Sequence, residues 1–163
     1  MGLDQFLYAN SFIVCKDAND MEDEYEQYQA KRGIAIKWRK ANQIHNWFVT
    51  NVQGGHDDCG IYEVSVSDLV KLHDTCKKVL DSTEFDGKTL DDPSTAWELL
   101  PTKEGFFFGS TDYDQWYWWD LQYTVDRLGR ILDNLVPSET DKFCTVHIGE
   151  PDWEVHFYYT SSW

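Results

Sequence analysis

Apolar side chains recur at alternating spacings of three and four residues along 111–135, which is the period of one face of an α-helix. The recurring residues are Trp118, Leu121, Val125, Leu128, Leu132 and Leu135. The spacing predicts a central helix near 112–135, with Thr111 as its N-cap, because a threonine side chain accepts a hydrogen bond from the first free backbone amides. Pro137 should end the helix, since proline lacks a backbone N–H and disfavours helical geometry in the preceding residue.

Shorter helical patterns occur in four other segments, and we predict a helix in each: 17–32, 41–52, 68–80 and 93–100. The apolar stripe of the third consists of Leu69, Leu72, His73, Cys76, Val79 and Leu80. Ser67 precedes this stripe and is the expected N-cap. The segment 17–32 should be a loop followed by an exposed helix that ends at Gly33.

Alternation of side chains predicts strands at 2–14, 33–40, 59–66, 142–148 and 153–161. In the second strand, Ile34, Ile36 and Trp38 should share one face. The phenylalanines of GFFFGS, 105–110, should pack against the central helix. Residues 149–152 have turn composition, so the last two strands should form a hairpin. The sequence therefore predicts one α+β domain over 1–163, with an antiparallel or mixed sheet of four to five strands packed against three to four helices.

The formal charge at pH 7 is −15, from 29 acidic and 14 basic side chains. This charge opposes direct binding to nucleic acid, which depends on Lys and Arg, and to anionic membranes. It suits either a basic protein partner or simple colloidal solubility. No run approaches the roughly 18 apolar residues that span a bilayer. The four cysteines, Cys15, Cys59, Cys76 and Cys144, are far apart, so we expect a soluble cytoplasmic protein with free thiols and no cofactor.

Two acidic rows, Asp20–Glu26 and Asp81–Asp92, are candidates for contact with a basic partner. Carboxylates in a row can imitate phosphates, although an acidic row can also be a solvated face. Neutralisation of the first row is the simple interpretation of the basic cluster around Lys37. The residues predicted to bind the partner are Asp20, Glu22, Asp23, Glu24, Tyr25, Glu26, Tyr28, Asp86, Asp91, Asp92, Trp116 and Trp119.

The central helix carries aromatic side chains beside its apolar stripe, at Trp116, Tyr117, Trp119 and Tyr123. Some of them should point away from the core, and exposed aromatics often mark a binding surface. A stacking site for a nucleotide and a protein hot spot both fit this pattern. Burial of the aromatics beneath the acidic connection 81–104 fits it equally well.

Zinc ligands occur at a knuckle-like spacing in two places, His56 with Cys59 and Cys144 with His147. However, Cys144 and His147 fall in a predicted strand, where residues three apart point to opposite faces. We therefore predict no metal site.

A second candidate chemistry is hydrolysis by a divalent ion held among His45, His56, Asp57 and Asp58. The same residues are ordinary turn composition after two glycines.

A nucleophilic dyad of Cys59 with His45 or His56 is a third candidate. Nothing in the flanking residues separates Cys59 from an inert thiol. The sequence contains no GxSxG, P-loop, GxGxxG or HExxH motif. We therefore predict no catalytic residue.

Five sequence blocks spread over nearly the whole chain carry a resemblance: MGLDQFLY, NQIHNWFVTNVQ, DDCGIYEVS, LPTKEGFFFGSTDYD and the ending YYTSSW. Together they resemble a family of small, functionally uncharacterised proteins encoded mainly in bacteriophage genomes. The resemblance implies a phage accessory protein in the bacterial cytoplasm, and it implies no catalytic residue. Small acidic phage proteins often block host defences, which is an analogy of class rather than of sequence.

The leading hypothesis is an acidic phage accessory protein that binds and inhibits a basic host or defence protein, of the anti-CRISPR or anti-restriction type. The alternative is a small metal-dependent hydrolase or nucleotide-binding protein that uses His45, His56, Asp57 and Asp58. A structural or assembly-related phage protein is a third hypothesis.

Overall fold

The long strand β6 (Trp153–Ser162) organises the sheet, because it pairs with three other strands. The computed structural model describes residues 2–13, 31–137, 144–146 and 153–163. Within these ranges, six strands form one sheet in the order β2-β1-β6-β5-β4, and β3 pairs with β6 beside this path. All the pairings are antiparallel. The other strands are β1 (Asp4–Ile13), β2 (Lys31–Arg39), β3 (Ile61–Val64), β4 (Val136–Pro137) and β5 (Cys144–Val146).

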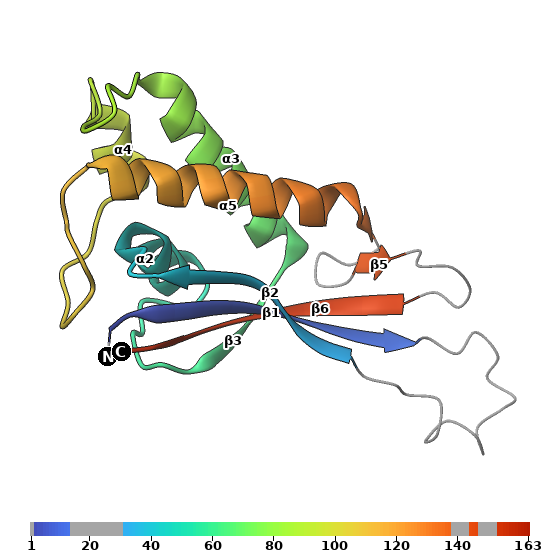
Figure 1. The fold of residues 1–163 in the computed structure, drawn as a ribbon. Coiled ribbons are helices and arrows are strands. Elements are labelled where there is room, and N and C mark those ends of the chain that lie inside the picture. The colour runs from blue at the N-terminus through green and yellow to red at the C-terminus, as the bar shows by residue number, and fades with distance from the viewer. Residues whose placement is uncertain (1, 14–30, 138–143, 147–152) are drawn as a thin grey trace, which may run out of the picture.

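Four described helices lie on one face of this sheet (Figure 1). They are α2 (Asn42–Asn51), α3 (Val66–Ser82), α4 (Ser94–Leu99) and α5 (Gln115–Asp133). The α+β class predicted from the sequence is thereby confirmed. Four of the described strands have four or more residues, and the short β4 and β5 extend the sheet beyond them.

The core lies between the sheet and the helices. Leu7 and Ile36 from the sheet are fully buried, as are Leu72 of α3 and Leu121 of α5. The rings of Phe48 on α2 and Tyr159 on β6 stack with centroids 3.8 Å apart. This stacked pair joins the helical layer to the central strand.

The predicted central helix is present as α5, but its buried face is turned from the predicted one. Tyr117, Leu121, Thr124 and Leu128 are buried, whereas Trp118, Val125, Leu132 and Leu135 are only partly buried. The indole N–H of Trp38 donates to the hydroxyl of Thr124 over 2.8 Å, so a polar residue belongs to the core. The apolar period could not identify this residue, since threonine does not count as apolar.

Two predicted helix caps are wrong. Asp114 rather than Thr111 caps α5, because the Asp114 carboxylate accepts from the backbone amides of Trp116 and Tyr117. Ser65 rather than Ser67 caps α3, through a capping box with Asp68. In α5, the observed cap Asp114 lies closer than Thr111 to the first buried residue of the helix, Tyr117. In α3, the observed cap Ser65 has an acidic partner three residues on, Asp68.

A β-bulge overturns the prediction that Ile34 and Ile36 share a face. Leu7 pairs with Ile36, and the next residue, Tyr8, pairs with Ile34, so Ala35 is the extra residue. Ile36 is buried while Ile34 is 55% exposed. A shift of one residue reverses the face to which each later side chain points.

The prediction that the GFFFGS phenylalanines pack on the central helix is also wrong. Phe106 and Phe107 are 72% and 51% exposed. Phe108 is buried, and its ring lies edge-on to His45 on α2, with centroids 5.4 Å apart.

Several predicted features lie outside the described residues. They are residues 17–30 of the predicted helix, the acidic row Asp20–Glu26 with Tyr25 and Tyr28, the turn 149–152, and His147. The prediction that the helix reaches residue 32 is wrong, because Lys31 and Arg32 already pair with β1 as the start of β2. Among the described residues, no helix combines the length and the apolar character needed to cross a membrane.

Candidate functional site

The loop before α5, residues 100–114, is fastened to the start of α2. The buried amide of Asn42 donates to the carbonyl oxygens of Phe108 and Ser110, over 3.2 and 2.8 Å. Its carbonyl oxygen accepts from the backbone N–H of Lys103 over 3.0 Å. Asn42 therefore uses both ends of its side chain to hold the loop in place.

Unusual backbone geometry accompanies this junction. Lys40 and Phe107 are non-glycine residues with positive φ angles, 59° and 61°. Gly109 has a φ of +93°, and a Cβ there would lie only 3.1 Å from the Cβ of Lys40. A side chain larger than hydrogen at 109 would both strain the backbone and push Lys40 away. Such conformations persist where surrounding contacts hold them, and they occur often at binding sites.

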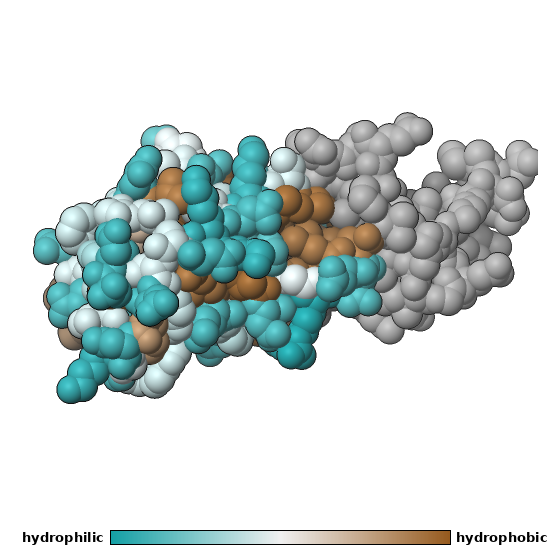
Figure 2. Space-filling view, turned by 90° about the horizontal axis from the view of Figure 1, so that it is seen from above, coloured by the Kyte–Doolittle hydropathy of each residue, from teal (hydrophilic) through white to brown (hydrophobic). Residues whose placement is uncertain are grey.

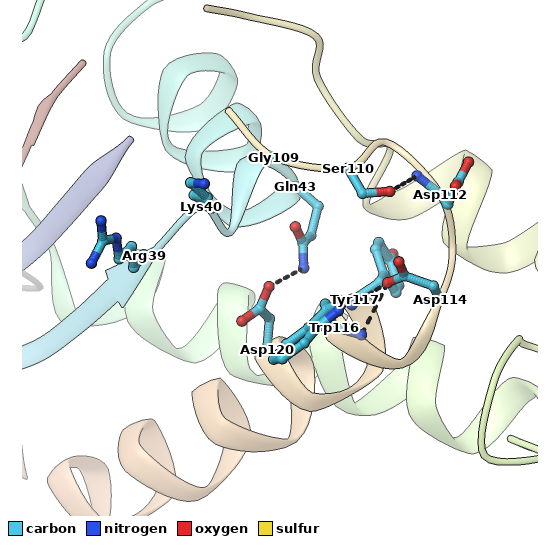
Figure 3. A pocket seen from close by; sticks show the side chains of 10 residues that line it. All are labelled: Arg39, Lys40, Gln43, Gly109, Ser110, Asp112, Asp114, Trp116, Tyr117 and Asp120. Atoms are coloured by element: carbon cyan, nitrogen blue, oxygen red, sulfur yellow. Dashed lines mark hydrogen bonds between the residues drawn. The ribbon is translucent and has the colours of Figure 1, made fainter. Parts of the chain in front are cut away.

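A pocket of about 410 Å³ lies between this junction and the first turns of α5 (Figure 3). Its volume falls in the range of about 300–1,000 Å³ that is usual for ligand sites. The lining residues are Arg39, Lys40, Gln43, Gly109, Ser110, Asp112, Asp114, Trp116, Tyr117 and Asp120. The pocket thus has basic residues on the β2–α2 side and carboxylates with an indole on the α5 side.

Asp120 is the least solvated carboxylate of this pocket. Within the described part of the chain, its side chain accepts one hydrogen bond, from the amide of Gln43 over 3.3 Å. Burial raises the pKa of Asp120 to about 7, against the opposing effect of the Gln43 hydrogen bond and with a further contribution from the Asp114 charge. At neutral pH this carboxyl group therefore takes up and releases protons readily.

Aromatic side chains continue from the pocket along the outer face of α5. Trp116 is 61% exposed and Trp119 is 47% exposed, with ring centroids 5.3 Å apart in an edge-on arrangement. Tyr123, one turn further, is also exposed, whereas Tyr117 is buried and donates its hydroxyl proton to the carbonyl of Leu100. The expectation that some of the four aromatics point away from the core is confirmed.

The acidic loop after α3 lies beside the start of α5. Phe85 stacks on Trp118 with centroids 5.2 Å apart. Thr89 forms a β-bridge with Asp114, and the backbone N–H of Leu90 donates to Tyr113. The tertiary structure thus brings the second predicted acidic row close to the predicted aromatic anchors.

The acidic side chains of that loop are exposed, and two of them also shape the backbone. Asp86 accepts from the backbone amides of Lys88 and Thr89, and Asp92 accepts from that of Ser94. These hydrogen bonds lower the pKa of both carboxyl groups, so both stay charged at neutral pH. Asp91 is exposed beside them.

A second polar cluster lies inside the molecule, around His45 of α2. His45 is fully buried, with Nδ1 2.8 Å from the Tyr159 hydroxyl and Nε2 2.9 Å from Oδ1 of Asp57. Asp57 Oδ1 also accepts from the indole N–H of Trp163 over 3.1 Å, and Oδ2 pairs with the Lys103 ammonium at 2.9 Å. We call these five residues the His45 network.

The hydrogen-bond geometry of the His45 network indicates which of its side chains are neutral and which are charged. A neutral His45 that donates from Nε2 to Asp57 and accepts at Nδ1 from the Tyr159 hydroxyl satisfies all three side chains. Burial lowers the pKa of His45, although the facing Asp57 acts in the opposite sense. Burial would raise the pKa of Asp57, but the hydrogen bond from Lys103 and the contact with His45 outweigh it and hold that pKa below its usual value. The network is therefore complete without a guest.

The candidate hydrolytic cluster is brought together only in part. His45 meets Asp57, but Asp58 accepts from the Tyr62 hydroxyl and the Gly60 amide instead. Both ring nitrogens of His45 are used, so the dyad of His45 with Cys59 does not form. Across the described ranges, no three His, Cys, Asp or Glu side chains come close enough to hold a metal ion.

The sequence did not single out Gln43, Asp120 or Lys40 as pocket residues. No motif marks them, because the pocket arises where the β2–α2 junction, the loop before α5 and the start of α5 come together. Comparison with protein-family models, with curated proteins and with solved structures finds no match to this chain.

Proposed function

We propose that this protein binds a basic protein partner through the exposed face around the start of α5. The single observation that carries the proposal is the exposed Trp116–Trp119 pair beside an acidic loop. Tryptophan is enriched among the residues that dominate binding energy at protein interfaces. Carboxylates at the rim would speed the encounter with a basic surface.

The charge and the surface agree with this proposal. The formal charge of −15 gives the molecule a strong attraction for basic surfaces. On the helix side, hydrophilic and intermediate side chains cover the end of the molecule where α5 starts, and the apolar strip lies further along, toward the middle (Figure 2). A polar surround of this kind is common at the rim of protein interfaces.

The resemblance to phage-encoded proteins supports a narrower form of the proposal. In that form the protein acts in the bacterial cytoplasm and inhibits a basic, nucleic-acid-handling protein of the host or its defences. The row Asp20–Glu26, with Tyr25 and Tyr28, would add to the contact surface.

The proposal is tested by capture from bacterial lysate with Trp119→Ala and with Ile61→Ala as a matched control. Ile61 is 65% exposed on β3, so its truncation also removes an exposed apolar side chain but leaves α5 intact. We expect a basic protein that is retained at about 50 mM salt and released at about 500 mM salt, because salt screens exposed charges. Trp119→Ala should weaken its binding about 30-fold, while Ile61→Ala leaves it unchanged.

Equal capture by the two variants, or a captured protein that is insensitive to salt, would contradict the proposal. Reversal of Glu22, Asp23 and Glu26 to lysine tests the first acidic row in the same assay. Retained binding by that folded variant would remove the row from the interface.

A further inference from the structure

The pocket behind Trp116 has an unusual combination of walls. One wall is an exposed indole, and another part of the lining is Asp120, a partly buried carboxylate with one long hydrogen bond from Gln43. A carboxylate has room for about four hydrogen bonds. Within the described chain, Asp120 thus has acceptor capacity that its neighbours leave unused.

We propose that this pocket receives a guanidinium group, as the side chain of an arginine on the basic partner. A guanidinium is planar, so it can stack on the face of Trp116 while it donates two parallel hydrogen bonds to the Asp120 carboxylate. A lysine ammonium is a compact, strongly hydrated charge that matches this arrangement less well. The inference rests on the proposed function and names the chemistry that its pocket selects.

The positive residues of the pocket leave room for such a guest. The Arg39 guanidinium is turned away from Asp120 in Figure 3, and its Nε lies 4.0 Å from Asp4 on β1. Lys40 stands on the wall opposite Asp120, at the strained junction with Gly109. The carboxylates on the α5 side of the pocket therefore outnumber the one cation that faces them, Lys40.

The guest would also correct an energetic mismatch. Burial makes ionised Asp120 costly, and it raises the pKa of this carboxyl to about 7. A bound guanidinium stabilises the ionised form, so binding should release a proton and strengthen as pH rises through 7. The other charged or titratable residues that line the pocket around Asp120 are Arg39, Lys40, Asp112, Asp114 and Tyr117. Of these, burial raises the pKa of Tyr117 well above neutrality, so it stays uncharged.

The test uses small probes and the full chain. Nα-acetyl-arginine amide is titrated against the protein while the tryptophan indole resonances are followed by NMR, with the citrulline and lysine analogues as neutral and compact-cation controls. We expect the arginine probe to shift the Trp116 indole resonance and to bind at least about fivefold more tightly than either control. Its affinity should rise about tenfold from pH 6 to pH 8, as Asp120 ionises.

Asp120→Asn should abolish both the affinity and its pH dependence. Asp133→Asn is the matched control, because Asp133 is exposed on the same helix and the substitution removes the same charge. Equal binding of the citrulline analogue, or undiminished arginine binding by Asp120→Asn, would overturn the inference.

The two proposals can fail separately. If capture of the basic partner depends on Trp119 but not on Asp120, the binding face stands and the arginine pocket is wrong. If the arginine probe binds through Asp120 but no basic protein depends on Trp119, the pocket stands and the partner-binding face is wrong.

Discussion

Asp57 and Asp120 are two partly buried carboxylates with opposite surroundings. Asp57 accepts from three donors, on His45, Lys103 and Trp163. Asp120 accepts, within the described residues, from the side chain of Gln43 alone. The pKa of Asp57 is held below its usual value, and that of Asp120 is raised to about 7.

The difference shows how burial has two outcomes for a charged group. In the His45 network, neighbouring side chains replace the water that Asp57 loses, so the network stabilises the fold. In the pocket, the replacement is incomplete, so Asp120 stabilises the fold little and keeps its capacity for a guest. A site of the second kind is the better candidate for binding.

The largest expected effect comes from His45→Ala, which removes the central side chain of the His45 network. The substitution leaves a cavity beside Phe108, and it removes one hydrogen-bond partner from Tyr159 and one of the three from Asp57. We expect the free energy of unfolding to fall by about 3–4 kcal/mol. Urea unfolding at pH 7 measures the change, and a loss below about 1 kcal/mol would show that the network contributes little.

Asp57→Asn tests the charge of the same network with a smaller change in shape. The variant leaves the Lys103 ammonium without its anion, so we expect a loss of about 2 kcal/mol at pH 7. The folded pKa of Asp57 is depressed, so its contribution is present above about 3.8 and is lost as pH falls through the folded value. The difference between wild type and variant should therefore persist at pH 5 and shrink in stronger acid. A difference that stays constant down to pH 2 would contradict this account.

Asp120→Asn should have the smallest effect and the opposite sign. The folded pKa of Asp120 is raised, so the ionised group opposes folding increasingly from about pH 3.8 to about pH 7. Asparagine cannot ionise, and we expect the variant to be about 1 kcal/mol more stable than wild type at pH 8, with a smaller gain at pH 5. Urea unfolding at the two pH values checks the gain, with Asp133→Asn as the control for charge alone. A destabilised variant at pH 8 would place Asp120 with Asp57 among the structural carboxylates.

Most of the described helices and the long strands follow from local patterns in the sequence. The apolar period identified α3 and α5, and side-chain alternation identified the long strands, because these patterns depend on neighbours within a few residues. The same patterns predicted that Cys76 is buried and that some aromatics of α5 are exposed, as the structure confirms. The face to which Ile34 points was predicted wrongly, because a bulge depends on the register with a second strand.

Which polar residues meet depends on the tertiary packing. His45 and Tyr159 are 114 positions apart, and Gln43 and Asp120 are 77 apart, with no motif to connect either pair. Whether a carboxylate becomes a closed structural group or an open acceptor depends on how many donors the packing brings to it. That number follows from the placement of α2 against β6 and α5, which no local pattern along the chain encodes.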